Sequence, residues 1–350
     1  VRRVVFFRPA LRYDPASPAP QDTAALAVLD KRRGRSYNPG AMEKLHFGDV
    51  TVERCVESEG PSFYPGFIFP DWDEDAFAAE RRDWIDPLYF DEESGRLLMS
   101  LHSYIIRTPH HTILVDTCVG NDKHRPDTKP WHMRQTPFLE DLTAMGVAPE
   151  EVDFVMCTHL HVDHIGWNTK LEDGRWTPTF PNAKYLFHET EYAYWEKADM
   201  GDGGSGMTRR DAFEDSVLPV MEAGQAVLVE GDHAIDDTLQ LEPSPGHSPG
   251  HVFLNLETEH GSAVFTGDVM HHPVQIAYPE WNSRFCYDPP QSQRTREAIV
   301  ERTADTSTLV LAAHFAMPVA GHIVSNPGGN GDRCKFQGVS QQGGRLLTES

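Results

Sequence analysis

The stretch "THLHVDHIGWN", residues 158–168, places three histidines and an aspartate within six positions, from His159 to His164. In an extended segment alternate side chains point the same way, so His159 and His161 can reach one metal ion together. Asp163 and His164 follow after a single residue, and a turn there would direct them to a second ion close by. Imidazole and carboxylate are ligand types that zinc accepts. The stretch therefore predicts half of a two-metal site.

Three further candidate ligands lie downstream, each just after a strand-like run. His247 follows "TLQLEP" within "SPGHSPGH", Asp268 ends "SAVFTGD", and His314 ends "TLVLAAH". A catalytic zinc ion takes about three protein ligands and keeps one position open for water. Any one of these residues alone is more commonly a surface or core residue. Together with the first motif, they predict a catalytic dinuclear centre at one edge of a sheet.

The charge of the chain is unevenly distributed. The chain has 350 residues and a formal net charge of -22, yet residues 1–41 hold eight Lys and Arg against three acids. We expect residues 1–41 to be a disordered basic leader or an over-long start, with "KRRGR" as a nucleic-acid-binding arm the alternative. Residues 42–325 should form one folded domain, followed by a flexible C-terminal tail over residues 326–350.

Composition also limits the class of protein. The acidic body would repel nucleic acid and anionic membranes, and no run approaches the roughly 20 apolar residues that span a bilayer. The cysteines are widely separated and form no CxxC pair; they are Cys55, Cys118, Cys157, Cys286 and Cys334. This use of cysteine predicts a reducing compartment, so we expect a cytoplasmic protein. We expect it to bind neither nucleic acid nor membranes.

Hydrophobic periodicity predicts alternating strands and helices. Helix 136–146 is expected to use Thr136 as its N-cap. The other predicted elements are strands at 50–57, 97–108, 112–117, 152–158, 184–187, 226–230, 251–257, 262–268 and 308–313, and helices from 189, over 208–221 and over 291–303. This order indicates an α/β or α+β fold, with two packed sheets inside and helices outside.

These stretches resemble the metallo-β-lactamase superfamily. In chain order they are "ILVDTCVG" with Asp116, "THLHVDHIG", "GHSPGH", "FTGD" and "AAH", and the resemblance spans about residues 44–323. It implies a four-layer αβ/βα sandwich in which two mixed β-sheets pack together, helices lie outside, and the metal ions lie at one edge.

The resemblance also implies a role for each candidate ligand. One ion would be held by His159, His161 and His247, and the other by Asp163, His164 and His314. Asp268 would bridge both ions, and Asp116 would orient ligands without binding metal itself. The implied cofactor is a pair of Zn²⁺ ions, although iron or manganese fits the same ligands.

The implied chemistry is hydrolysis. Two ions can share a hydroxide whose pKa falls to about 7 while one ion polarises the substrate oxygen. Asp163 or Asp268 would take up the proton after attack, and no serine or cysteine nucleophile is needed.

Within the superfamily the chain resembles the branch of acyl-homoserine lactonases and methyl-parathion-hydrolase-like enzymes. Flavodiiron proteins carry Glu where His161 stands, and glyoxalase-II-like enzymes carry a helical domain after the last metal histidine. Homoserine lactonases usually carry Tyr three residues after the bridging aspartate, where this chain has His271. A histidine there is closer to the organophosphate-hydrolysing enzymes. His271 would either donate a hydrogen bond to the substrate or leaving group, as a catalytic residue, or only support the ligands.

Aromatic residues near the ligands are candidates for a substrate pocket. They are Trp131, Phe138, Trp167, Met270, Trp281 and Phe285, which would form an apolar cleft for a small neutral hydrophobic substrate; core packing explains each of them equally well. The segment "PSFYPGFIFPDW", residues 61–72, either lines a pocket or subunit contact, or packs its aromatics onto the core.

The sequence thus predicts a dinuclear zinc hydrolase that opens a lactone or cleaves a neutral hydrophobic ester. A phosphotriesterase or a hydrolytic dehalogenase of aromatic substrates is the alternative, with the same metal chemistry. A non-catalytic metal-binding or sensor protein on the same fold is the alternative of another class. Since relatives are often dimers, a homodimer is also expected.

Overall fold

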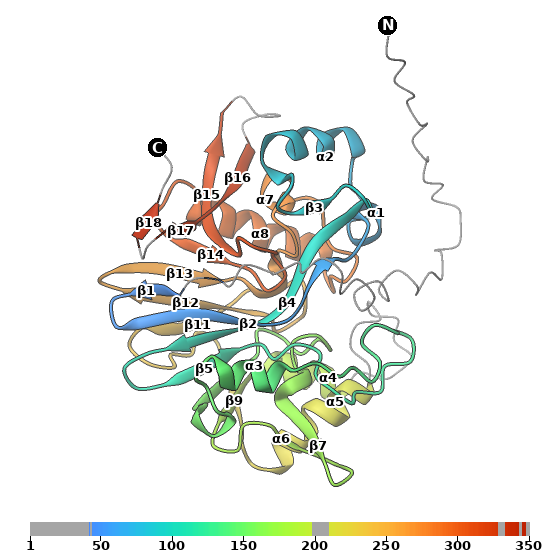
Figure 1. Cartoon of the computed structure of the whole chain (residues 1–350), viewed down its shortest axis with the longest axis vertical. Coiled ribbons are helices and arrows are strands. Elements are labelled where there is room, and N and C mark those ends of the chain that lie inside the picture. Colours follow the sequence, from blue (N-terminus) through green and yellow to red (C-terminus); the bar gives the residue numbers. More distant parts are fainter. Residues whose placement is uncertain (1–41, 43, 198–209, 328–332, 343–344, 348–350) are drawn as a thin grey trace, which may run out of the picture.

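The computed structural model describes residues 42, 44–197, 210–327, 333–342 and 345–347 (Figure 1). The expected basic leader, residues 1–41, lies outside the described residues. The larger sheet has the order β1-β2-β4-β5-β6-β9-β10, with β3 paired to β4. Its strands are β1 (Leu45–Phe47), β2 (Val50–Pro61), β3 (Phe90–Asp91), β4 (Arg96–Arg107), β5 (Thr112–Val115), β6 (Phe154–Met156), β9 (Lys184–His188) and β10 (Ala226–Val229).

The second sheet has six strands in chain order. They are β11 (Leu239–Pro243), β12 (Val252–Thr258), β13 (Gly261–Phe265), β14 (Leu309–Leu311), β15 (Ala320–Asn326) and β16 (Arg333–Gly338). Two small hairpins complete the described strands: β7 (Thr169–Glu172) with β8 (Arg175–Pro178), and β17 (Ser340–Gln342) with β18 (Arg345–Leu347).

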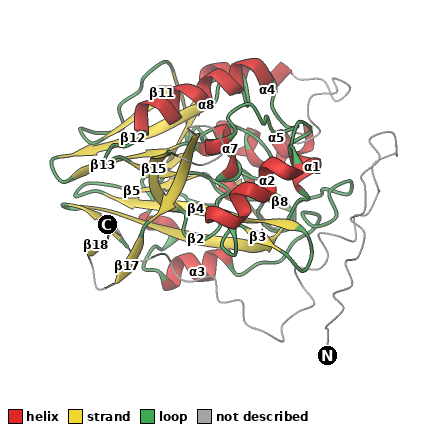
Figure 2. Ribbon diagram, turned by 90° about the horizontal axis from the view of Figure 1, so that it is seen from above, coloured by secondary structure: helices red, strands yellow, loops and turns green. Residues whose placement is uncertain are grey.

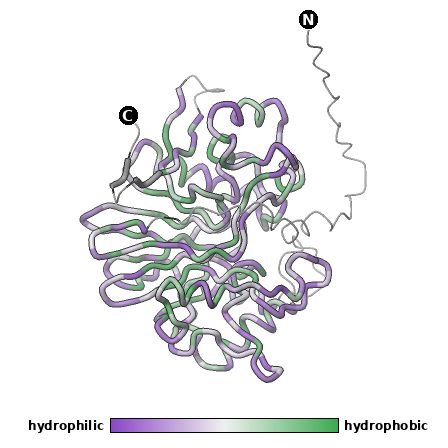
Figure 3. The backbone as a smooth tube through the Cα atoms, in the orientation of Figure 1, coloured by the Kyte–Doolittle hydropathy of each residue, from purple (hydrophilic) through white to green (hydrophobic). Residues whose placement is uncertain are grey.

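Alternating side chains of the central strands serve two different cores. In β4, Tyr104 and Ile106 point into the core between the two sheets, whereas Ile105 points to the helices on the outer face. In β12, Leu254 lies between the sheets and Phe253 on the outside. Strands covered on both faces are hydrophobic along much of their length. In Figure 3 the central strands carry much of the green that marks hydrophobic residues. The predicted arrangement of two packed sheets with helices outside is confirmed.

The helices cover the two outer faces. They are α1 (Pro65–Ile68), α2 (Glu74–Glu80), α3 (Phe138–Ala144), α4 (Glu189–Lys197), α5 (Arg210–Ser216), α6 (Leu218–Glu222), α7 (Val274–Ala277) and α8 (Pro289–Thr303). In Figure 1, α3, α5 and α6 lie in the lower half of the molecule with β5 and β9, and α2, α7 and α8 lie in the upper half with β14, β15 and β16. Figure 2 shows α8 along one side of the strands and α3 along the other. None of the helices in the described part of the chain is long and apolar enough to cross a membrane.

Three sequence-based expectations about elements need correction. The N-cap position of helix α3 is Pro137, which makes no capping hydrogen bond, and not Thr136, whose backbone N–H donates to Asn121 Oδ1 at 2.8 Å. The helix predicted over 208–221 is two helices, α5 and α6. Pro219 lies in the first turn of α6, and because it has no N–H, one continuous helix would lose a hydrogen bond there.

The third correction concerns the C-terminal tail. Residues 333–338 form β16, which pairs with β15 over six residues and buries Phe336 against the core, so the folded domain extends beyond residue 325. Alternation between Arg333 and Gly338 is weak, because most of their side chains are only half-buried at the sheet edge.

The strand directions explain why the candidate ligands meet. Strands β5, β6 and β9 are parallel, and so are β13 and β14. Strand β11 runs antiparallel to β12, which runs antiparallel to β13, so β11, β13 and β14 share one direction. The loops after these strands therefore leave their sheet at a common edge.

Candidate metal centre

The seven predicted ligands are buried at this edge and form two neighbouring groups. His159, His161 and His247 form the histidine group. Asp163, His164 and His314 form the carboxylate group. The structure brings together the residues that the sequence places up to 155 positions apart, and Asp268 lies between the two groups.

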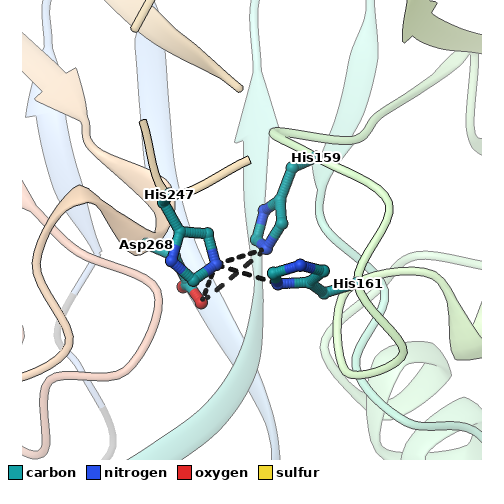
Figure 4. A group of neighbouring side chains, drawn as sticks. All are labelled: His159, His161, His247 and Asp268. Carbon is teal, nitrogen blue, oxygen red and sulfur yellow. Dashed lines mark hydrogen bonds and ion pairs between the residues drawn. The ribbon is translucent and has the colours of Figure 1, made fainter. Parts of the chain in front are cut away.

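In the histidine group, three ring nitrogens point toward one another (Figure 4). His247 Nε2 lies 3.1 Å from His159 Nε2 and 2.9 Å from His161 Nδ1. Asp268 Oδ2 lies 3.3 Å from His247 Nε2 and 3.7 Å from His159 Nε2. Three nitrogen lone pairs and one carboxylate oxygen thus converge on one point.

The carboxylate group is more open. Asp163 Oδ1 lies 3.8 Å from His164 Nε2, and Asp163 Oδ2 lies 3.6 Å from His314 Nε2. Asp268 Oδ1 lies 3.3 Å from His164 Nε2 and 3.1 Å from His314 Nε2. Each carboxylate oxygen of Asp268 therefore faces a different group.

Hydrogen bonds to the remaining ring nitrogens fix which nitrogen faces the centre. His164 Nδ1 donates to Asp116 Oδ2 at 2.8 Å, and His314 Nδ1 donates to the backbone carbonyl of Ser100 at 3.0 Å. Since a carboxylate and a carbonyl only accept, the Nε2 lone pairs of both histidines are left free for a cation. Asp116 also accepts from the Thr158 backbone N–H at 2.8 Å, so it holds both ends of the motif.

The donor set fits a metal ion. Asp163 Oδ1, His164 Nε2 and Asp268 Oδ1 are buried and have no hydrogen-bond partner among the described residues. Leaving buried polar atoms without a partner costs about 1–3 kcal/mol each, and a bound cation removes that cost. Imidazole and carboxylate ligands suit zinc, and also iron or manganese.

Electrostatics differ between the two groups. Burial lowers the pKa of His159 and His247 well below the usual value, and that of His161 to about 3. Burial also acts to lower the pKa of His164, but the carboxylates of Asp268, Asp116 and Asp163 outweigh it and raise this pKa well above its usual value. The histidine group is therefore neutral in the metal-free protein.

The second half of the motif at residues 158–168 is held against the loop at residues 117–120 by close backbone contacts. Thr117 N donates to His164 O at 2.7 Å, and Gly166 N donates to Cys118 O at 2.8 Å. A Cβ atom on Gly166 would lie 1.8 Å from Val119 O, so only glycine fits there. The turn that aims Asp163 and His164 therefore depends on Gly166.

A cavity of about 850 Å³ opens above the centre. Its floor contains His161, Asp163, His247, Asp268, His271 and His314. Its walls come from residues 57–63 at the end of β2, residues 99–101 of β4, residues 129–136, and Phe285. The apolar wall residues include Phe63, Met99, Leu101 and Trp131.

Two of the six predicted pocket residues line this cavity, namely Trp131 and Phe285. The prediction for the other four is corrected, because they pack in the cores and are absent from the cavity lining. Phe138 stacks on Trp167 with centroids 5.5 Å apart, Met270 is fully buried, and Trp281 stacks on Tyr278 at 4.3 Å. Trp167 Nε1 donates to Glu57 Oε1 at 2.9 Å, which fixes the ring in place.

Sequence reasoning missed Glu57. This buried carboxylate lines the cavity and accepts from the backbone N–H groups of Val119 at 3.2 Å and Gly120 at 3.0 Å. It also lies 3.3 Å from the guanidinium of Arg134. Strand β2 also carries Glu53, Arg54 and Glu59, so nothing in its sequence distinguishes Glu57 as a buried residue. Phe63 lies in the aromatic segment 61–72, for which a pocket wall was one of the two interpretations; Ile68 and Phe69 of that segment pack in the core.

A second set of buried polar residues anchors the wall loop, defined as residues 121–136. Lys123 Nζ donates to Thr169 Oγ1 at 2.7 Å and to the Asp215 carbonyl at 3.2 Å. Arg125 makes two 2.8 Å hydrogen bonds to the Asp215 carboxylate. The Asp215 carboxylate also lies 3.5 Å from Lys123 Nζ, so it contacts both basic side chains. Burial lowers the pKa of Lys123 to about 7.

His271 lies on the cavity floor beside the centre. Its Nε2 is 3.3 Å from Asp268 Oδ2, and neither ring nitrogen has a hydrogen-bond partner among the described residues. Gln275 Oε1 accepts from the His271 backbone N–H at 2.6 Å and so holds this part of the loop. The ring is thus free to bond to a molecule in the cavity.

Comparisons with known proteins identify the family and the fold. Residues 99–314 match the family model described as the metallo-beta-lactamase superfamily. An N-acyl homoserine lactonase of Bacillus thuringiensis is 28% identical over 187 residues, which cover 50% of this chain and 66% of the relative. The N-acyl homoserine lactonase AttM of Azorhizobium caulinodans is 37% identical over 169 residues, covering 47% of this chain and 60% of the relative. The matches therefore span less than two thirds of these curated relatives.

Solved structures show the same fold. The crystal structure of the hydrolase AbOPH of the beta-lactamase superfamily aligns with a TM-score of 0.71 at 22% identity, over 86% of this chain and 98% of that one. AidC, a dizinc quorum-quenching lactonase in complex with the product N-hexanoyl-L-homoserine, aligns with a TM-score of 0.69 at 15% identity, over the same shares of each chain.

Proposed function

Because the chain belongs to the metallo-beta-lactamase superfamily, we propose that it is a metal-dependent hydrolase that opens a lactone or cleaves a neutral hydrophobic ester. One observation carries the proposal: two groups of buried ligands share Asp268 at the floor of a cavity large enough for a small molecule. The N-acyl homoserine lactonases among its relatives support the choice of a lactone.

The proposed cofactor is a pair of zinc ions. The histidine group would hold one ion, the carboxylate group the other, and Asp268 would contact both. When bound, the ions would lower the pKa of coordinated water and polarise the carbonyl oxygen of the substrate.

The chain's own residues have separate tasks in this proposal. Asp163 Oδ1 and Asp268 Oδ1 are buried acceptors beside the cavity floor, so either can take up the proton released when water attacks. His271 can donate a hydrogen bond to the leaving oxygen, since its ring nitrogens have no hydrogen-bond partner in the described part of the chain. Ser248 is fully buried, which argues against its use as a nucleophile.

The cavity walls favour an uncharged substrate with an apolar part. Phe63 and Phe285 pack with ring centroids 5.9 Å apart, and Trp131 and Met99 add further apolar surface. The acidic side chain of Glu57 is bonded to N–H donors and to Arg134, so it is already neutralised within the protein. An acyl chain or an aromatic ring would fit against such walls.

A substrate panel tests the proposal. The purified protein, loaded with zinc, should hydrolyse a homoserine lactone or an aryl ester, and a chelator should abolish that activity. Zinc stoichiometry is measured on the same samples. Activity that survives complete metal removal would overturn the metal-dependent mechanism.

A phosphotriesterase is the second candidate, and His271 is the observation that favours it. This histidine stands where homoserine lactonases usually carry tyrosine, and it lies on the cavity floor. Paraoxon in the same panel distinguishes this candidate, and a chlorinated nitrile tests a dehalogenase. Two bound zinc ions with no hydrolysis of any panel member, including a cephalosporin, would favour a non-catalytic metal-binding protein.

A further inference from the structure

Helix α4 carries a buried carboxylate that the proposed chemistry does not use. Glu191 lies in the first turn of α4, and its side chain is almost completely buried. It is not among the residues that line the cavity, and it contacts none of the seven predicted ligands through its carboxylate. Burying a carboxylate costs free energy unless several hydrogen-bond donors satisfy it. The donors to Glu191 therefore indicate which segments this side chain holds in place.

Three N–H groups donate to this carboxylate. Glu191 Oε1 accepts from the backbone N–H of Leu160 at 3.0 Å and from Trp195 Nε1 at 2.6 Å. Glu191 Oε2 accepts from the backbone N–H of Gly250 at 2.8 Å. Hydrogen bonds to an ionised acceptor are roughly twice as strong as neutral ones.

The two backbone donors belong to the two loops that form the histidine group. Leu160 stands between His159 and His161, and Gly250 follows His247 by three positions. The two loops leave different sheets, β6 in the larger sheet and β11 in the smaller one. One carboxylate therefore joins the segments that supply all three histidines of the group.

Packing around Glu191 is close on both sides. A Cβ atom on Gly250 would lie 2.3 Å from the backbone nitrogen of Glu191, so this loop can approach α4 only because residue 250 is glycine. The indole ring of Trp195 meets the ring of His161 edge to face, with centroids 5.6 Å apart. Helix α4 thus fixes the backbone of both loops and one of the ligand rings.

We propose that Glu191 is a positioning residue that sets the zinc affinity of the histidine group. The inference rests on the proposed function only in assuming that this group binds metal. With the two loops joined, the three nitrogens are already in place before the ion arrives. Without the join, ion binding must also order the loops, and that cost reduces affinity.

The decisive variant is Glu191→Gln. An amide keeps the shape of the side chain but has only one accepting oxygen, and its NH₂ group would face one of the two backbone N–H donors. One loop therefore loses its attachment. We expect the zinc affinity of the histidine group to fall by about 10- to 100-fold, as for other residues that orient metal ligands. The zinc affinity of the carboxylate group should change less.

Affinity is measured by competition of the zinc-loaded protein against chelators of graded strength. The absorption of the cobalt-substituted protein reports independently on ligand geometry at the affected site. Glu189→Gln, on the exposed surface of the same helix, is the matched control and should bind zinc like the unmodified protein. If kcat recovers at saturating zinc in Glu191→Gln, the side chain positions ligands and does not act on the substrate.

Two results would overturn the inference. One is a Glu191→Gln protein that is less stable but binds both zinc ions as tightly as the unmodified chain. The other is an equal loss of affinity at both sites. Should Glu191→Gln fail to fold, Glu191→Asp keeps the charge but shortens the side chain by one methylene, so the carboxylate cannot reach both Leu160 N and Gly250 N. Unchanged zinc affinity in that variant would also overturn the inference. An unmodified chain that binds no zinc would instead contradict the proposed function.

Discussion

The floor and the wall of the cavity are built on different principles. On the floor, histidine and aspartate side chains converge, and several of their polar atoms have no hydrogen-bond partner among the described residues. The other ring nitrogens of His164 and His314 are fixed by Asp116 and Ser100. In the wall loop, the buried polar atoms of Lys123 and Arg125 are used to anchor the loop to Asp215. The floor thus keeps its bonding capacity for an added cation, whereas the wall loop uses its buried polar groups to hold the cavity lining in place.

From this contrast we infer that metal binding and substrate choice depend on different residues. Changes in the floor should alter metal content, and changes in the wall should alter substrate preference or stability with metal content intact. Each prediction below tests that separation.

Replacing the shared carboxylate should have the largest effect. Asp268→Ala removes the group that faces both halves of the floor, at 3.3 Å from His247 Nε2 and 3.1 Å from His314 Nε2. Loss of a ligand should exceed the loss of an orienting residue, so metal affinity should fall by more than about 100-fold and turnover should vanish. Metal analysis after gel filtration, with exposed Asp237→Ala as control, checks this. Two bound ions and full activity in Asp268→Ala would refute the assignment.

Asp116→Asn should affect one half of the floor more than the other. The asparagine oxygen can still accept from Thr158 N, but the amide nitrogen would face His164 Nδ1 and repel its proton. Affinity for one ion should fall by about 10- to 100-fold, with less change for the other. Chelator titration followed by metal analysis measures both ions, and Asp173→Asn in an exposed turn is the control. Equal loss of both ions would show that Asp116 does not distinguish the halves.

Lys123, in the wall loop, should make the unfolding free energy of the protein increase with pH above about 7. Its pKa is lowered to about 7 in the folded protein, from a usual value of 10.5. Between these values the unfolded chain binds a proton that the folded chain does not, so Lys123 makes stability rise with pH, by at most about 1.4 kcal/mol per pH unit. Below the lower value the cost of the buried charge is present in full.

Lys123→Met removes this dependence. The difference in unfolding free energy between the variant and the unmodified chain should therefore shift in favour of the unmodified chain as pH rises from 7 to about 9. Denaturant unfolding at each pH measures it, with the exposed Lys129→Met in the same loop as control. Parallel pH profiles for the two proteins would contradict the shifted pKa.

Phe63→Ala should give the smallest effect and change only substrate preference. Phe63 lines the cavity and stacks on Phe67 with centroids 5.4 Å apart. We expect kcat/KM for an aryl ester to fall by about 3- to 10-fold, because part of an apolar contact is lost, with unchanged zinc content. Neighbouring Tyr64, which is exposed, provides the control variant Tyr64→Ala. A change in zinc content in Phe63→Ala would mean that wall and floor are coupled.

The sequence predicted the floor far better than the wall, for a physical reason. Metal ligands must have particular side chains at the ends of particular strands, and the strand before each ligand is visible as an apolar run. Pocket walls need only apolar side chains, which cores need too. Hence the sequence alone could not distinguish the cavity-lining residues Trp131 and Phe285 from the core residues Phe138 and Met270.

Buried polar anchors were equally hidden. Lys123 and Arg125 read as surface residues in an acidic chain, because only the tertiary structure brings Asp215 beside them. The same holds for Glu191, whose partners are backbone groups of two distant loops. Strand β16 escaped prediction because an edge strand with half-buried residues shows little alternation.

The contact of Gly166 with Val119 has a consequence for laboratory evolution. A methyl group at residue 166 would collide with a backbone oxygen, so every substitution there displaces the turn that carries Asp163 and His164. Libraries that seek new substrates should therefore leave residues 117–120 and 164–167 unchanged. Diversity is better placed at Phe63, Trp131 and Phe285, where the protein can explore new specificities without losing its reaction.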